Sequence, residues 1–139
     1  MAYWLMKSEP SSYSWDDLVR DGGTEWDGVR NNAARLHLKA MKKGDEAFFY
    51  HSNIGKECVG IMEITEESFP DPTAEKGSPW VVVRVAPVRA LAHPVTLAAI
   101  KADPKLADMD LIRQSRLSVG RVTPAEWKHI LKKSEKPEG

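Results

Sequence analysis

The amino-acid sequence predicts an α+β domain, in which a mixed or antiparallel β-sheet curls into a barrel around one core, with peripheral helices. Two observations support this fold class. Runs of β-favouring residues follow one another mostly without a full crossover helix, a pattern typical of antiparallel or mixed sheets. The chain of 139 residues is long enough for one domain and too short for two full cores. We expect one domain over residues 1–133 and a flexible tail over residues 134–139.

The N-terminal part is expected to form a strand and two helices. Ala2 to Lys7 is apolar and rich in aromatic residues, so it predicts a strand that ends before Pro10. Ser14, three residues before Asp17, predicts the start of a short helix that Gly22-Gly23 ends. Residues 24–30 are expected to be irregular. Asn31 or Asn32 then caps a second helix, whose apolar residues recur at helical spacing up to Gly44.

The middle of the chain predicts a β-hairpin and a long strand. Residues 45–52 and 58–66 are β-like runs, and the five residues 53–57 between them suit a hairpin loop. Trp80 to Leu91 is rich in valine and predicts a strand with a bulge or corner at Pro87, because proline cannot donate a hydrogen bond to a neighbouring strand.

The C-terminal part predicts helix, strand and helix. Thr96 to Ala102 is expected to be helical as far as Pro104, and Leu117 to Val122 to form a short strand. Thr123-Pro124-Ala125-Glu126 combines a capping-box spacing with proline at the first helical position, which predicts a last helix.

Composition limits the functional classes. No apolar run approaches the roughly 20 residues that span a bilayer, and no signal peptide is recognisable, so we expect a cytoplasmic protein without a membrane partner. Cys58 is the only cysteine, which excludes an internal disulfide and favours a buried structural role. The 20 basic and 20 acidic residues cancel, which argues against coating of nucleic acid by bulk charge. Basic residues nevertheless gather in residues 28–43 and 112–133, which form either one positive face or two ordinary solvated surfaces.

Catalytic motifs are not recognisable in the sequence. Neither glycine-rich phosphate-binding pattern occurs, and the four histidines lack zinc-helix spacing, so we expect no metal, no cofactor and no catalytic residues. His51 adjoins Ser52, but neighbouring strand residues point to opposite faces and cannot act as base and nucleophile together.

Trp26 is the most informative of the five tryptophans. It lies in a polar segment, residues 25–32, where neither helix nor strand periodicity explains a large aromatic side chain. An indole beside a guanidinium and amides is typical of a pocket that stacks on a planar heterocycle. The alternative is an indole that anchors a loop to the sheet.

Four blocks of sequence, in order, resemble the signature of the EVE domain. They are Trp4-Leu5-Met6-Lys7-Ser8-Glu9-Pro10, Trp26-Asp27-Gly28-Val29-Arg30-Asn31, Phe49-Tyr50-His51-Ser52-Asn53 and Arg116-Leu117-Ser118-Val119. The resemblance spans nearly the whole chain. It implies a PUA-like β-barrel, related to the YTH and SRA domains that read methylated bases, and a pocket for a base extruded from its strand.

The resemblance also implies roles for individual residues. Trp26 would stack on the base, Ser8, Glu9 and Asn31 would face its edge, and Tyr50 and Ser52 would line the floor of the pocket. Further residues are expected to contact the phosphate or fix the pocket loops: Arg30, Arg116 and Ser118. Trp80 is a second candidate for an aromatic wall, and Glu9 could instead pair with Arg116.

We therefore expect a monomeric module that binds DNA or RNA carrying a modified, methylated base. Two alternatives remain at this point: an enzyme acting on a base or nucleotide through Glu9 or His51, and an adaptor that binds protein. Trp26→Ala is expected to abolish binding of a modified oligonucleotide and to leave the fold intact.

Overall fold

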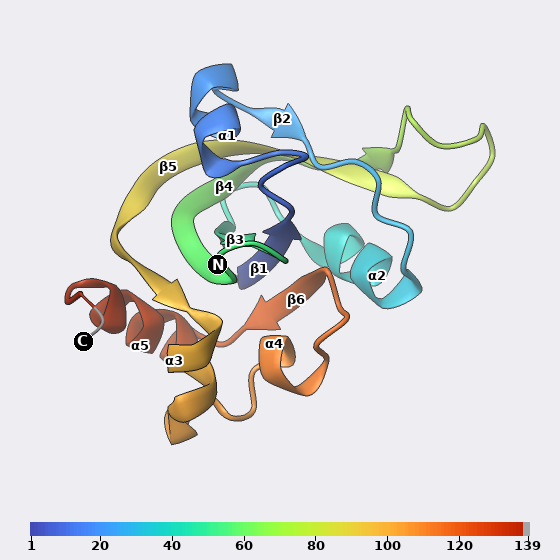
Figure 1. Cartoon of the computed structure of the whole chain (residues 1–139). Coiled ribbons are helices and arrows are strands. Elements are labelled where there is room, and N and C mark those ends of the chain that lie inside the picture. Colours follow the sequence, from blue (N-terminus) through green and yellow to red (C-terminus); the bar gives the residue numbers. More distant parts are fainter. Residues whose placement is uncertain (138–139) are drawn as a thin grey trace.

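The computed structural model describes residues 1–137, which form six strands and five α-helices (Figure 1). The strands are β1 (Tyr3–Ser8), β2 (Thr24–Glu25), β3 (Glu46–His51), β4 (Glu57–Pro70), β5 (Val81–Thr96) and β6 (Val119–Val122). The helices are α1 (Trp15–Asp21), α2 (Asn32–Ala40), α3 (Leu97–Ala102), α4 (Asp110–Arg113) and α5 (Pro124–Ser134), and a 3-10 turn, η1, covers Pro104–Leu106. Of the predicted tail, Ser134 belongs to α5, and residues 138–139 lie outside the described residues.

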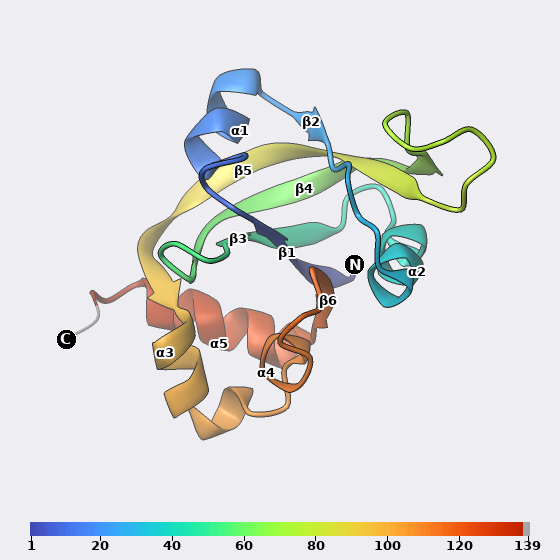
Figure 2. The same cartoon turned by 45° about the vertical axis from the view of Figure 1, so that its right-hand side comes forward.

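The strands form one mixed sheet in the order β2-β5-β4-β3-β1-β6. β1 pairs with β3 in parallel, and every other pair is antiparallel. The long strands β4 and β5 bend strongly, so that the sheet curls without closing (Figures 1 and 2). The predicted mixed, curled sheet is confirmed, whereas the closed barrel is wrong because β2 and β6 remain as unpaired edges.

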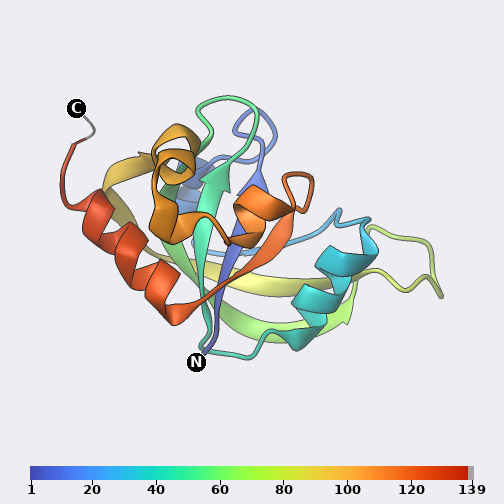
Figure 3. The ribbon, with the colours of Figure 1, turned by 90° about the horizontal axis from the view of Figure 1, so that it is seen from below.

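Both faces of the central strands are buried, in contrast to the single core that we expected. On β1, Trp4 and Met6 belong to one hydrophobic cluster and Leu5 to another; on β3, Phe49 and Phe48 are divided in the same way. This alternation follows from the two-residue period of a strand. Residues of α1 and α2 complete the first cluster, and residues of α3, α4 and α5 complete the second, on opposite sides of the sheet (Figures 1 and 3).

The helix boundaries follow local sequence signals. Ser14 and Asp17 form the predicted capping box of α1, and Gly22 ends this helix with a φ of 74°, a conformation that glycine adopts without steric cost. Asn31 caps α2, and Thr123 caps α5 through a second capping box. The sequence missed α4, a helix of four residues, and η1.

The predicted strands are correct in type, and those that correspond to β4 and β5 were predicted too short. The hairpin of β3 and β4 is present, but β4 continues to Pro70 and β5 to Thr96. The pairing of these strands shifts register opposite Pro87, as expected for a residue that cannot complete the ladder. Residues 24–25, expected to be irregular, instead pair with β5 as strand β2.

Candidate nucleic-acid interface

A hollow of about 420 Å³ lies where β1 ends, between the loop that follows it and strand β2. We call it the slot. It is lined by Lys7, Ser8, Glu9, Ser12, Tyr13, Thr24, Glu25, Trp26 and Asp27. Three residues predicted for the base site, Ser8, Glu9 and Trp26, therefore lie together, although they come from two separate segments.

Trp26 is both a wall of the slot and a member of the hydrophobic core. Its backbone N–H donates to the carbonyl oxygen of Val83 at 2.8 Å, which extends the pairing of β2 with β5. Its ring meets Phe49 edge to face, with centroids 5.4 Å apart, and the residue is only 7% exposed. The two interpretations of Trp26 are thus compatible: the indole anchors its segment and borders the hollow.

The polar edge of the slot is held by bonds between loops. The Ser8 hydroxyl donates to the carbonyl oxygen of Tyr13 at 2.6 Å, which closes the loop after β1. The Glu9 carboxylate accepts a hydrogen bond from the Asn53 side-chain amide at 2.7 Å. The alternative pairing of Glu9 with Arg116 is wrong for residues 1–137, since Asn53 takes the carboxylate and no ion pair joins Glu9 to Arg116.

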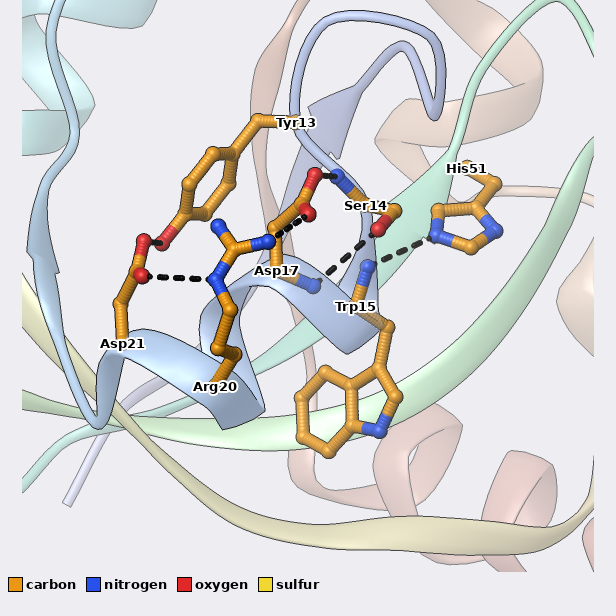
Figure 4. A network of polar contacts seen from close by, with 7 residues as sticks. All are labelled: Tyr13, Ser14, Trp15, Asp17, Arg20, Asp21 and His51. Atoms are coloured by element: carbon orange, nitrogen blue, oxygen red, sulfur yellow. Dashed lines mark hydrogen bonds and ion pairs between the residues drawn. The ribbon is translucent and has the colours of Figure 1, made fainter.

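Helix α1 supports the opposite wall of the slot through the polar network in Figure 4. The Tyr13 hydroxyl donates to Asp21 at 2.8 Å, and Arg20 bridges Asp21 and Asp17. Burial and the neighbouring carboxylate of Asp21 raise the pKa of Tyr13, so the phenol keeps its proton at neutral pH. Tyr13 is therefore a fixed hydrogen-bonding aromatic group beside the hollow.

His51 connects α1 to the end of β3 (Figure 4). Its Nε2 accepts a hydrogen bond from the Trp15 backbone N–H at 3.1 Å, so the ring is neutral in this arrangement. Burial lowers the pKa of His51 more than the charges of Glu57 and Asp16 raise it. His51 lines neither the slot nor the second hollow described below, and its contacts describe a structural support.

The segment that follows Trp26 is tied to the loop between β4 and β5. The side chain of Asp71 accepts hydrogen bonds from the Gly28 backbone at 3.1 Å and from the Arg30 guanidinium at 2.9 Å. Burial disfavours ionisation of Asp71, but the bonds from Thr73, Arg30 and Gly28 outweigh it and lower its pKa to about 2. Asp71 thus holds residues 26–30 in place as a buried anion.

Three predicted site residues lie in this supporting region and line neither hollow. Arg30 is engaged by Asp71, and its guanidinium carbon lies 5.8 Å from the centre of the Trp80 ring. The side-chain oxygen of Asn31 accepts from the Ala34 N–H at 2.9 Å, so it caps α2. Direct contacts of Arg30, Asn31 and Trp80 with a base remain predictions.

A second hollow, of about 680 Å³, lies across β1 from the slot. We call it the basic hollow. It is lined by Lys7, Glu9, Tyr50, Ser52, Asn53, Lys56, Leu97, Lys101, Leu111, Ile112, Ser115, Arg116 and Ser118. The sequence correctly placed Tyr50 and Ser52 on one side of their strand, but that side faces this hollow and not the slot with Trp26. Arg116 and Ser118 are here as well.

The two basic stretches of the sequence meet only in part. Helix α2 packs against β6, and burial, together with the charge of Arg121, lowers the pKa of His37. The lysines of α5 lie on another side of the sheet (Figure 3).

Cys58 is fully buried, as expected. Within residues 1–137, no group of acidic, histidine or cysteine side chains could hold a metal ion, and no helix could span a membrane.

A curled mixed sheet that carries helices on both faces and an aromatic-walled slot at one end defines a small α+β domain with a candidate binding site. The chain belongs to the EVE domain family, whose model matches residues 2–133.

The relatives span nearly the whole chain. Human thymocyte nuclear protein 1 is 37% identical over 97% of this chain and 75% of its own length. Among solved structures, a protein from Rhodopseudomonas palustris is 55% identical, with a TM-score of 0.91 over 97% of this chain and 94% of its own. Human THYN1 in complex with DNA containing 5-methylcytosine is 34% identical, with a TM-score of 0.91 over 98% of this chain and 99% of its own.

The fold extends further than the family. The YTH domain of the MRB1 protein from Zygosaccharomyces rouxii, solved with N6-methyladenosine RNA, has a TM-score of 0.60 over 99% of this chain and 89% of its own. At 14% identity this likeness shows a shared fold.

Proposed function

We propose that this chain is a binding module that recognises a modified, methylated base flipped out of a DNA or RNA strand, and that it binds the base without chemical reaction. The observation that carries the proposal is the slot itself, with Trp26 as a wall and Ser8 and Glu9 at its edge. The complex of human THYN1 with DNA containing 5-methylcytosine supports it, since that relative shares the fold over almost its full length.

The energies required are within the reach of such a slot. Extruding a base costs a few kcal/mol, and stacking on an aromatic side chain returns about 1–3 kcal/mol. The remainder must come from hydrogen bonds to the base edge, for which the Glu9 carboxylate and the Ser8 hydroxyl oxygen are acceptors. A buried methyl group adds on the order of 1 kcal/mol, which sets the expected preference for the modified base.

Calorimetric titration with paired oligonucleotides tests the proposal. The pairs are single-stranded DNA with 5-methylcytosine or cytosine, and RNA with N6-methyladenosine or adenosine. The wild type is expected to prefer one modified strand over its plain counterpart by about fivefold, the equivalent of one buried methyl group. Equal affinity for both members of every pair contradicts the proposal, and a change in oligonucleotide mass after incubation contradicts binding without reaction.

Two substitutions connect this preference to the slot. Trp26→Phe keeps an aromatic ring against Phe49 but removes part of the wall, and Glu9→Gln removes the charge at the edge. Both are expected to weaken binding of the preferred strand. Glu75→Gln is the matched control for charge, because Glu75 is exposed in the loop between β4 and β5 and lines neither hollow. A Trp26→Phe variant with unchanged affinity would remove Trp26 from the site.

A further inference from the structure

Four cationic side chains converge on the basic hollow from four separate segments. Lys7 comes from β1, Lys56 from the loop before β4, Lys101 from α3, and Arg116 from the loop before β6. These positions are up to 109 residues apart in the sequence, so only the fold brings them together. Lysines and arginines are common on any surface, whereas convergence of four of them on one concave site focuses positive potential there.

The positive charge of this hollow is not neutralised by the protein. The Lys7 ammonium donates to the carbonyl oxygen of Ser115 at 2.9 Å, and within residues 1–137 no ion pair joins Lys56, Lys101 or Arg116 to a carboxylate. Elsewhere cations do have acidic partners, as in the pairs of Arg20 with Asp17 and Asp21. Glu9 is the one acid among the described residues that line the hollow, and Asn53 already binds it.

The walls of the hollow suit a nucleotide better than a bare anion. Its volume of about 680 Å³ exceeds that of the slot, at about 420 Å³, which takes a single base in the proposed function. Apolar side chains of Leu97, Leu111 and Ile112 lie beside the ring of Tyr50, and three serines supply hydroxyl groups. Burial raises the pKa of Tyr50 to about 12, so its phenol stays neutral beside the cations.

The basic hollow is continuous with the slot through two shared residues, Lys7 and Glu9. A strand whose base entered the slot would therefore have its next nucleotide at this ridge. The Glu9 carboxylate repels a phosphate group on the ridge itself, whereas Lys56, Lys101 and Arg116 attract it to the far side.

We propose that the basic hollow binds the nucleotide that flanks the recognised base, with its phosphate held by Lys56, Lys101 and Arg116. This proposal rests on the proposed function for its geometry. The ligand is then a strand of at least two nucleotides, whose modified base binds in the slot and whose flanking phosphate binds in the basic hollow. We expect the basic hollow to bind modified and plain strands equally, because the modified base lies in the slot. Of the four cations of the hollow, only Lys7 also lines the slot.

Fluorescence anisotropy with a labelled single-stranded decanucleotide, plain or modified, tests the inference. Lys101→Glu and the double variant Lys56→Glu/Lys101→Glu are compared with Lys128→Glu, which makes the same charge change at an exposed position of α5 outside the hollow. Each phosphate contact in a single strand contributes about 0.7 to the slope of log affinity against log salt concentration. Loss of one contact is therefore expected to weaken binding about fourfold at 0.15 M salt and to reduce the slope by about 0.7.

The preference for the modified strand is expected to stay the same in the hollow variants, because their effect is on plain and modified strands alike. Hollow variants no weaker than Lys128→Glu would overturn the inference. The inference would also be overturned by an inhibition assay in which Lys101→Glu weakens binding of inorganic phosphate or a nucleoside monophosphate but leaves binding of the decanucleotide unchanged. If the wild type shows no preference for modification, the proposed function fails, and the plain decanucleotide still decides the role of the hollow. Lys56 and Lys101 are exposed, and thermal unfolding verifies that each variant folds.

Discussion

The slot and the basic hollow lie side by side but on opposite faces of the same strands. Trp26 and Phe49 belong to the face covered by α1 and α2, whereas Tyr50 and Leu111 belong to the face covered by α3 to α5. The slot is small, aromatic and acidic at its edge; the hollow is larger and cationic. In the proposed reader this difference separates two tasks: the identity of a base is checked on one face, and the strand is held by charge on the other.

Removal of the aromatic wall of the slot is expected to destabilise the protein most. Trp26→Ala deletes a side chain that is 7% exposed and packs on Phe49, so we expect a loss of about 3–5 kcal/mol in the free energy of unfolding. The expectation from sequence that this variant keeps its fold intact is therefore revised to a marked loss of stability. Urea denaturation measures the effect, and Leu36→Ala, at an exposed position of α2, is the control. A loss below about 1 kcal/mol would show that the indole is not part of the core.

The sequence predicts features that depend on neighbouring residues better than features that depend on distant partners. Caps such as Ser14 and Thr123 act within three residues, so α1 and α5 were predicted with their first residues. Strand β2 was missed because it has two residues and depends on a partner about 60 positions away. The closed barrel failed for a related reason, since closure depends on how β4 and β5 bend and not on any local pattern.

The candidate site shows the same limit. Trp26 was recognisable because an aromatic residue in a polar segment lacks a local explanation, and the fold does place it with Ser8 and Glu9. Period two correctly put Tyr50 and Ser52 on one side of the chain, since both line the basic hollow, but only the sheet reveals that this side lies away from Trp26. The continuous apolar run of residues 47–50 was the available signal for burial on both faces. The convergence of Lys56 with Lys101 has no sequence signal.

A second prediction concerns the packing beneath the slot. A Cβ atom at Gly60 would lie 2.5 Å from the Trp15 ring, so Gly60→Ala must displace the first residue of α1. We expect a loss of about 2–3 kcal/mol in the free energy of unfolding, the upper range for overpacking. Trp15→Phe provides space, and a double-mutant cycle by urea denaturation is expected to show the two changes coupled by at least about 0.5 kcal/mol. Additive effects would contradict the contact. Binding of a plain strand through the basic hollow should change little.

A third prediction sharpens the role of the tether behind Trp26. Asp71→Asn removes the charge that accepts hydrogen bonds from Gly28 and Arg30, so we expect a loss of about 1–2 kcal/mol at pH 7. Because the folded-state pKa of Asp71 is lowered to about 2, the wild-type advantage is present above the ordinary pKa and disappears as pH falls from about 4 to about 2. Denaturation at a series of pH values measures it. An advantage that persists at the acidic end would mean that ionisation is not its cause.

The smallest expected effect comes from His51, which holds α1 against the sheet on the side of the slot. Its pKa is lowered in the folded protein, mainly by burial, so the unfolded chain binds a proton more readily than the folded one. The stability contributed by neutral His51 is therefore present above pH 6.5 and declines as pH falls below it. His51→Gln keeps an acceptor for the Trp15 N–H but cannot titrate, so we expect its unfolding free energy to decline less than that of the wild type between pH 7 and pH 5. His37→Gln is the matched control, because burial and Arg121 lower the pKa of His37 on α2, away from the slot.

Both variants should flatten the pH profile of stability. Only His51→Gln should flatten the pH dependence of binding to a modified strand, since only His51 supports the loop that forms the slot. Equal pH dependence of binding in the wild type and His51→Gln would show that the support from His51 does not reach the slot.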